Sequence, residues 1–256
     1  MPLPKNLSKD LSKYISELKG ELARLPGRPR KGELLARAGE IPLIWPEAEF
    51  PPGRSDADQF EKTLSFWGAQ VHRVGSDAEV VPKVAEVIEE IGARIVSRWH
   101  CPRLDVFDWD GGLKHLDLEW IEIDPDQVAA AESFEERKKI RDRLERIEVG
   151  ITDADRAVAH TGTMLFEHSP ERNGFLTLFP WTHIAVVRLS QMVRTIQDLV
   201  DLLGREHAGK PWRPNTVFVT GPSRSADIDL THGQGAAGPG RLHVVLIEDA
   251  TESSRP

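Results

Sequence analysis

The order of apolar and polar positions predicts alternating helices and strands in the first part of the main domain. Apolar residues at helical spacing indicate helices at residues 56–67 and 77–91. Short runs rich in β-branched residues indicate strands at residues 70–74 and 94–99. Alternation of helix and strand is typical of a parallel sheet, so the pattern predicts an α/β domain.

The next stretch carries more charge. Gly111-Gly112 predicts a turn, and apolar residues alternate with carboxylates over residues 116–124, which predicts a half-buried strand with its acidic side chains in solvent. Residues 132–147 predict a charged helix supported by opposite charges four residues apart. Further on, residues 195–204 predict a helix that ends at Gly204.

The two ends of the chain differ from this pattern. Residues 5–24 place leucine and isoleucine at helical spacing with charges between them, which predicts an amphipathic helix. A connector rich in proline and glycine follows at residues 26–55. We therefore expect an N-terminal region at residues 1–55, an α/β domain at residues 56–249 and a disordered tail at residues 250–256.

Composition limits the classes of function. The chain has 256 residues, 39% of them hydrophobic, and a net charge of −8, which argues against nucleic acid and anionic membrane surfaces as partners. It contains no run of about 18 apolar residues, and its first residues do not resemble a secretory signal. We expect a cytoplasmic protein with no membrane insertion.

Cysteine and histidine usage bears on cofactors. Cys101 is the only cysteine, so the chain cannot supply the thiolates of an iron–sulfur cluster. Its neighbour His100 raises the alternative of an assisted nucleophile, but adjacent side chains in an extended segment point apart, which favours a loop or core cysteine. The nine histidines lack the spacing of metal ligands, so no metal is predicted. His183, within an apolar run, is interpreted as a hydrogen-bonded core residue, with lining of a pocket as the alternative.

Two glycine-bearing turns follow or precede apolar runs in the second half. Gly162 lies within residues 149–166 and Gly221 within residues 217–229, and both can adopt a positive φ. Hydroxyl groups of Thr161, Thr163 and Thr220 flank them. Neither turn has the spacing of a phosphate-binding P-loop or a dinucleotide fingerprint, so the residues alone indicate an anion-binding pocket without a named cofactor.

Each turn has a predicted local structure. In the turn at Gly221, we expect a buried strand at residues 216–220 to end at the glycine and Ser223 to cap a short helix. The first backbone amides of that helix, together with Arg224, would bind an anion. The alternative is that Ser223 only caps and Arg224 pairs with Asp227 or Asp229. In the first, residues 152–155 predict a helical turn. Thr161, Gly162 and Thr163 would face the pocket if the two turns are neighbours in the sheet.

Four blocks in the second half resemble a known family. VGIT-AD-A-A-TGTMLF, F-T-FP-HIAVVRL, VFVTGPSRSADID and GP-LHVVLIED occur in this order over residues 145–249. In order and spacing they resemble the lactate-utilisation protein C family, the LUD-domain proteins. The sequence departs from that family's pattern at His160, Trp181 and Ala237.

The resemblance implies a fold and a function. The fold is a three-layer α/β/α domain with a mainly parallel sheet, similar to sugar-phosphate isomerases, CoA transferases and formyltetrahydrofolate cyclo-ligases. The function is participation in oxidation of L-lactate to pyruvate together with iron–sulfur partner proteins that carry the clusters. No catalytic residue is identified. The predicted ligand-binding residues are Asp155, Thr161, Gly162, Thr163, Gly221, Ser223, Arg224 and Asp227.

Two other functions remain open. One is a stand-alone enzyme with ligase or transferase chemistry on a phosphorylated, folate-like or CoA-like substrate, since one fold supports many activities. The other is a regulatory or scaffolding protein that contacts its partner mainly through the N-terminal amphipathic helix.

Overall fold

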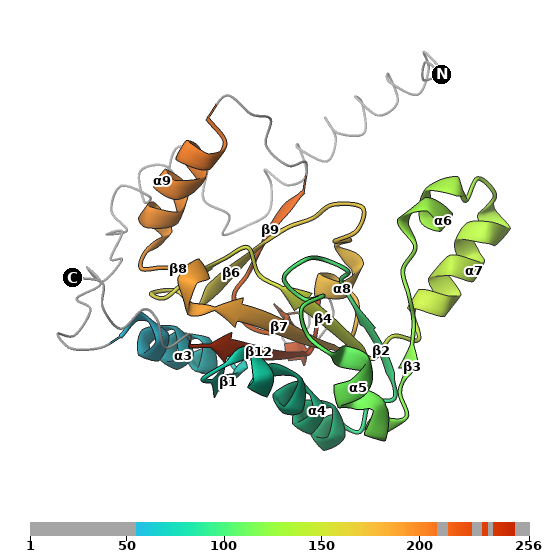
Figure 1. Ribbon diagram of the computed structural model, residues 1–256. Coiled ribbons are helices and arrows are strands. Elements are labelled where there is room, and N and C mark those ends of the chain that lie inside the picture. The colour runs from blue at the N-terminus through green and yellow to red at the C-terminus, as the bar shows by residue number, and fades with distance from the viewer. Residues whose placement is uncertain (1–54, 209–214, 227–231, 235–237, 249–256) are drawn as a thin grey trace, which may run out of the picture. The chain divides into compact units, whose positions relative to one another are not determined.

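A six-stranded sheet forms the centre of the domain in the computed structural model, which describes residues 55–208, 215–226, 232–234 and 238–248 (Figure 1). Its strand order is β1-β12-β7-β4-β2-β3, and every neighbouring pair is parallel. The parallel sheet predicted from the sequence is therefore confirmed. The strands are β1 (Gln70–Val74), β2 (Ile95–Arg98), β3 (Glu119–Trp120), β4 (Val149–Asp153), β7 (Thr182–Arg188) and β12 (Arg241–Ile247).

A second, mixed sheet of four strands has the order β8-β5-β6-β9. Its strands are β8 (Met192–Val193), β5 (Arg156–Val158), β6 (Thr163–Glu167) and β9 (Thr216–Val219). A separate antiparallel pair consists of β10 (Arg224–Ala226) and β11 (His232–Gln234). The helices are α3 (Asp56–Phe66), α4 (Val80–Ile91), α5 (Trp109–Leu113), α6 (Pro125–Ala130), α7 (Phe134–Leu144), α8 (Phe175–Leu178) and α9 (Ile196–Glu206), with 3₁₀ turns at Asp77–Glu79, Lys114–Leu116 and Leu189–Gln191.

The two faces of the six-stranded sheet are covered differently, which corrects the predicted α/β/α layering. Helices α3, α4 and α5 lie on one side, and the four-stranded sheet lies on the other (Figure 1). Met164 and Phe166 of β6 join the main core, while Leu165 packs in a second cluster with Leu199 and Leu203 of α9. Because successive strand residues point to opposite faces, β6 is buried on both. A sheet backed by α9 thus stands where a layer of helices was expected.

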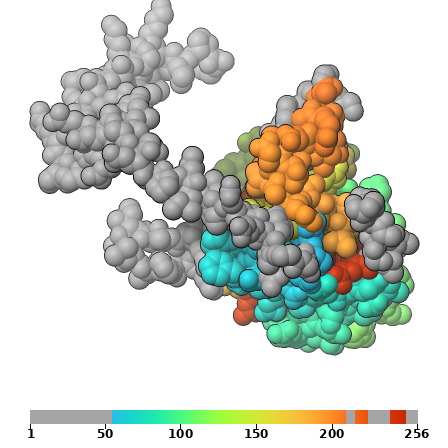
Figure 2. Space-filling model, turned by 90° about the vertical axis from the view of Figure 1, so that its left-hand side faces the viewer, coloured from blue at the N-terminus to red at the C-terminus, as the bar shows by residue number. Residues whose placement is uncertain are grey.

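Figure 2 shows the edge of this arrangement. The cyan and teal helices α3 and α4 form the lower part of that face, and the orange helix α9 forms the upper part. α9 has apolar residues on one side and begins with a capping box, in which Thr195 and Asp198 bond each other's backbone amides. It continues through Gly204 to Glu206, so the predicted end at Gly204 is two residues short.

Several local predictions are confirmed and others are wrong. α3, β1, α4, β2 and α7 occur where the sequence predicts them. The predicted Gly111-Gly112 turn lies instead within α5, whose Asp108 cap accepts a hydrogen bond from the Gly111 amide at 2.9 Å. A Cβ on Gly112 would come within 2.3 Å of Val81, so this glycine lets α5 approach α4. Only Glu119–Trp120 of the predicted strand at residues 116–124 is a strand.

Other predictions fall outside the described residues: the N-terminal helix, most of the connector and the tail at residues 250–256. Within the described ranges, no helix combines the length and apolar character needed to cross a membrane.

Candidate functional site

The topology of the six-stranded sheet singles out the carboxyl ends of β2 and β4. These strands are adjacent and parallel, with Arg98 opposite Ile151. The chain leaves β2 towards β3 on one side and leaves β4 towards β7 on the other. In open parallel sheets, ligands bind beyond the carboxyl ends of two strands whose connections diverge in this way.

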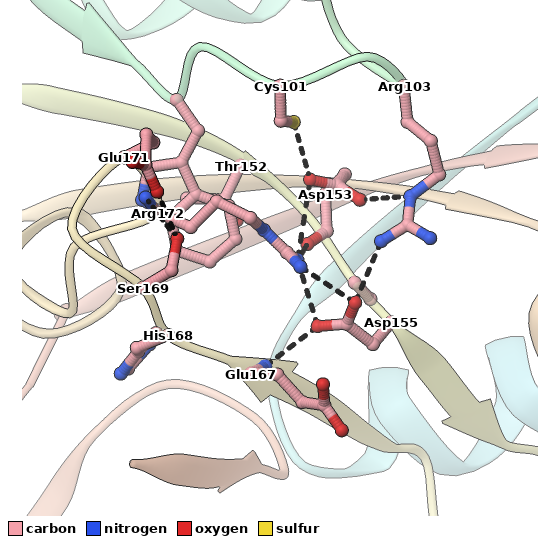
Figure 3. Close-up of polar contacts among 12 residues, drawn as sticks. Cys101, Arg103, Thr152, Asp153, Asp155, Glu167, His168, Ser169, Glu171 and Arg172 are labelled. Carbon is pink, nitrogen blue, oxygen red and sulfur yellow. Dashed lines mark hydrogen bonds and ion pairs between the residues drawn. The ribbon is translucent and has the colours of Figure 1, made fainter. Parts of the chain in front are cut away.

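Four charged side chains meet at this point and form the carboxylate–arginine cluster: Arg103, Asp153, Asp155 and Arg172 (Figure 3). Arg172 donates to Asp155 in a bidentate contact, with each terminal nitrogen 2.8 Å from a carboxylate oxygen. Arg103 Nη2 lies 2.8 Å from Asp155 Oδ1, and its Nε donates to Asp153. Bidentate arginine–carboxylate contacts of this kind are among the stronger ion pairs in proteins.

The cluster is electrically balanced and mostly buried. The side chains of Asp153, Asp155 and Arg172 are 3%, 14% and 12% exposed, whereas Arg103 is 40% exposed. Burial alone would raise the pKa of Asp155, but hydrogen bonds from Arg172 and the Glu167 amide and the arginine charges lower the pKa below its usual value. Arg172 also lies 4.7 Å from the Trp99 ring centre in a cation–π contact. Arg103 is thus the member that can most readily exchange its partners for a ligand.

Cys101 borders the cluster as a protonated thiol. Its Sγ donates to Asp153 Oδ1 at 3.0 Å, and the side chain is buried. Burial, followed by the hydrogen bond and charge of Asp153, raises the pKa of Cys101 to about 12. A nucleophilic cysteine needs a lowered pKa, so the interpretation of Cys101 as a structural residue is favoured. His100 bonds Glu122 instead.

In the cluster and near it, five buried side-chain atoms lack hydrogen-bond partners among the described residues. They are Ser97 Oγ, His168 Nδ1, Arg172 Nε, Asn173 Oδ1 and His183 Nδ1. Contacts with aromatic side chains link three of these residues. Trp99 touches His168 and donates its Nε1 to the Asn173 carbonyl at 2.9 Å, and Phe166 contacts both Trp99 and His183. Such unpaired groups are uncommon in folded proteins and call for ordered water or a ligand.

His183 is the hydrogen-bonded core residue that the sequence predicts. It lies in β7 with no exposed surface, and its Nε2 is 2.7 Å from Thr152 Oγ1. Burial, with a smaller contribution from His168, lowers the pKa of His183 to about 3. The ring is therefore neutral near pH 7.

The two glycine turns are neighbours, which is the condition that a shared pocket requires. β6 and β9 pair in antiparallel fashion, with Met164 opposite Val219. Thr163 Oγ1 lies 2.7 Å from both Thr161 Oγ1 and Thr220 Oγ1, and these three hydroxyls form the hydroxyl cluster. Gly162 and Gly221 have φ values of 66° and 83°, which confirms their predicted positive φ. Both turns pack against the end of α3. A Cβ added to Gly162 would lie 3.0 Å from the Leu64 nitrogen, and one added to Gly221 would lie 2.8 Å from Trp67 Cβ.

Other parts of the predicted site are rearranged. Asp155 does not lie at the hydroxyl cluster. Its Oδ2 accepts a hydrogen bond from the Glu167 amide at the far end of β6. Glu167 is four residues from Thr163, which is about 13 Å along an extended strand. Residues 152 and 153 end β4 and begin no helical turn. The strand expected to be buried at residues 216–220 corresponds to β9, which lies at an edge of the mixed sheet, and Phe218 in it is 54% exposed.

The second turn also lacks its predicted helix. Residues 224–226 form the extended strand β10, so Ser223 caps no helix there. The Ser223 amide donates to the Pro239 carbonyl at 2.8 Å, which ties the segment to a neighbouring chain portion. Helix-start amides are therefore absent from residues 223–226. Asp227 and Asp229 lie outside the described residues.

Arg103, Asp153 and Arg172, which belong to the candidate site, were not identified from the sequence. Asp153 had a usable signal, because it is a polar residue at the carboxyl end of a buried strand. Arg172 had none, because it lies in a loop and reaches Asp155 only through the tertiary fold.

In sequence, the chain is similar to a known domain family and to several named proteins. The chain matches the LUD domain family over residues 57–247. Lactate utilization protein C of Halalkalibacterium halodurans is 27% identical, over 75% of this chain and 81% of that protein. Its counterparts in Deinococcus radiodurans and Bacillus subtilis are also 27% identical, over 83% and 70% of this chain and 90% and 66% of their own lengths.

A crystal structure of a DUF162 family protein from Deinococcus radiodurans is 20% identical, with a TM-score of 0.49, and covers 76% of this chain and 99% of that one. The family match includes all six strands of the parallel sheet and the whole of the carboxylate–arginine cluster. It confirms the resemblance seen in the second half and extends it to α3 and β1. The chain therefore belongs to the LUD domain family.

Proposed function

We propose that this protein is a component of a lactate-utilisation system and supports oxidation of L-lactate to pyruvate together with iron–sulfur partner proteins. Membership of the LUD domain family, and likeness to several proteins named Lactate utilization protein C, support this assignment. The single cysteine is engaged with Asp153, so clusters would belong to the partners.

The main structural support for the proposal is the carboxylate–arginine cluster at the carboxyl ends of β2 and β4, where arginine and aspartate side chains lie next to each other. A 2-hydroxy carboxylate offers a carboxylate that accepts from arginine and a hydroxyl that donates to a carboxylate. Arg103, the exposed member, would leave Asp153 and Asp155 to bind the ligand's carboxylate. The ligand's hydroxyl would then donate to the freed aspartate oxygens, while Arg172 continues to neutralise Asp155.

This arrangement implies a preference between related small acids. L-lactate satisfies both kinds of group in the cluster. Pyruvate and propionate lack the hydroxyl donor, so they would leave an aspartate oxygen unpaired, at a cost of about 1–3 kcal/mol. We therefore expect L-lactate to bind more tightly than either.

The turns identified from the sequence provide a second location for a small anion. It would use the hydroxyl cluster of Thr161, Thr163 and Thr220, the glycines 162 and 221, and Ser223 with Arg224 and Asp227. The positive-φ glycines and neighbouring hydroxyls support it. The balance of charge and the unpaired buried atoms favour the carboxylate–arginine cluster as the primary site.

Deletion of the gene in the source organism tests the function. Cells growing on L-lactate should lose L-lactate consumption and recover it when the intact gene is restored, while growth on pyruvate should not change. Unchanged consumption in the deletion strain would contradict a role in lactate oxidation.

Calorimetric titration of the purified chain tests the location. Arg103→Ala should weaken binding of L-lactate by about 1.5–3 kcal/mol if the cluster is the site. Arg224→Ala should produce that loss if the turns are the site, and Arg205→Ala, on the exposed side of α9, serves as the matched control for loss of one positive charge. L-lactate binding that survives both substitutions would exclude both locations.

A further inference from the structure

A separate pocket lies at the opposite edge of the six-stranded sheet. It has a volume of about 530 Å³ and lies at the amino ends of β2, β4, β7 and β12. Its walls include Gly92, Glu148, Phe179, Trp181 and Arg241. This volume is within the usual range for small-molecule sites. The pocket shares no residue with the carboxylate–arginine cluster, which lies at the carboxyl ends of the strands.

Two aromatic rings in the pocket wall are held in place and half exposed. Phe179 and Trp181 are each 50% exposed. Phe179 stacks on Phe175 with ring centres 4.5 Å apart. Trp181 lies directly against Gly240, where a Cβ would come within 2.6 Å of the indole ring. Both rings are therefore supported from one side, and fixed aromatic surfaces of this kind favour stacking of a planar group.

The charged groups in the wall are unequally engaged. Arg146 pairs with Glu119, and Glu145 pairs with Arg141. Glu148 accepts from the backbone amides of Arg94 and Ile95 at 2.6 and 3.0 Å. Arg241 makes no hydrogen bond or ion pair through its side chain with any residue in the described ranges, so it is the wall's positive charge available to a ligand.

A second hollow borders the pocket at the amino end of β2. This hollow of about 300 Å³ shares Gly92 and Ala93 with the pocket, and Arg94 and His115 belong to its wall.

We propose that this pocket binds a nucleotide, with the base stacked on Trp181 and a phosphate paired with Arg241. Aromatic stacking tolerates different bases, and arginine binds phosphate through two parallel hydrogen bonds. An organic cation would also be attracted to aromatic rings beside carboxylates. The engagement of Glu145 and Glu148, and the availability of Arg241, favour the anion.

Titration calorimetry on the full chain with AMP, adenosine, ribose 5-phosphate and choline tests this proposal. AMP should bind at sub-millimolar concentration. Trp181→Ala should weaken both AMP and adenosine by about tenfold or more, because base stacking is lost. Arg241→Ala should weaken AMP to a similar extent and leave adenosine unchanged. Phe66→Ala and Arg205→Ala are controls that remove an exposed ring and an exposed charge elsewhere.

Trp181→Phe keeps a stacking surface and should retain most AMP binding, and circular dichroism verifies that every variant is folded. Absence of AMP binding at millimolar concentration would overturn the proposal. So would AMP binding that persists in both Trp181→Ala and Arg241→Ala, or choline binding without AMP binding. Because Arg103→Ala leaves this pocket untouched, AMP binding in that variant separates this site from the lactate site.

Discussion

Asp155 connects three segments of the chain through its carboxylate: the loop after β2, the loop after β6, and β6 itself. Its partners are Arg103, Arg172 and the Glu167 amide. Because all of these contacts converge beside buried Asp153, each charge depends on the others for compensation. The same interdependence that makes the cluster suitable for a charged ligand also makes it sensitive to substitution.

Arg172→Ala should destabilise the protein by about 3–5 kcal/mol, because it leaves two buried carboxylates with less positive charge. Arg103→Ala should cost less, since Arg103 is partly exposed and its ion pairs are screened by solvent. Urea denaturation of both variants measures the difference. Equal and small losses would mean that the buried pair contributes little to stability.

Cys101 should resist alkylation in the folded protein. Its raised pKa leaves almost no thiolate at pH 8, and the side chain is buried. Iodoacetamide should therefore modify it only after unfolding, which mass spectrometry can follow with and without urea. Rapid modification of the folded chain would contradict the hydrogen bond to Asp153.

At the level of secondary structure, α3 supports the two glycine turns at its carboxyl end. Gly162 and Gly221 approach Leu64 and Trp67 too closely for a side chain and have positive φ values. This contact gives the glycines a structural role that does not depend on a ligand. It also explains why two distant turns can present a shared hydroxyl cluster.

Gly162→Ala should therefore destabilise the protein by about 1–2 kcal/mol through backbone strain and contact with α3. Gly204→Ala provides the opposite control: this glycine lies in α9 with open space around its Cβ, so alanine should stabilise the helix by about 1 kcal/mol. Thermal unfolding of the two variants measures whether each substitution lowers or raises the stability of the protein. Stabilisation by Gly162→Ala would show that the turn can relax away from α3.

The sequence predicted these elements unevenly, for physical reasons. α4 was predictable because its helical periodicity gives it one dominant buried face. β1 was predictable from its β-branched valines, although only Val74 is buried in that strand. The mixed sheet was not predictable, because the run Met164-Leu165-Phe166 is buried on both faces, as in a central parallel strand. The helix after Ser223 was predicted from capping chemistry alone, and pairing of β10 with β11 overrides it.

For the domain as a unit, stability should fall on mild acidification. The folded pKa of His183 is about 3 and that of His243 about 4, both lowered chiefly by burial, below an unfolded value near 6.5. The unfolded chain thus binds protons first, so this stability is complete above pH 6.5 and is lost as pH falls towards 4. The slope should be about 1.4 kcal/mol per pH unit for each histidine.

His183→Gln should make this slope shallower than in the unsubstituted protein, while the part of the slope due to His243 should remain. Urea denaturation of both proteins at several values between pH 7 and pH 4.5 measures the two slopes. The lowered pKa of Asp155 affects stability only near and below pH 4, so it does not interfere. An identical slope in His183→Gln would mean that His183 is not kept neutral by the fold.

The candidate site depends on contacts across the whole fold, which is why its residues were only partly predictable. Asp155 was identified from the family blocks, but its partners lie 17 and 52 residues away in sequence. The parallel sheet could be predicted, and with it the general edge at which ligands bind. The strand order that selects β2 and β4 depends on tertiary packing.

The rate of L-lactate consumption by the deletion strain, complemented with Arg103→Ala, tests the central claim most directly. With Arg205→Ala as control and equal protein abundance verified by immunoblot, the Arg103 variant should restore at most about one tenth of the wild-type rate, as loss of a charge-assisted bond implies. Restoration of the full rate by Arg103→Ala would contradict a role for the carboxylate–arginine cluster in lactate utilisation.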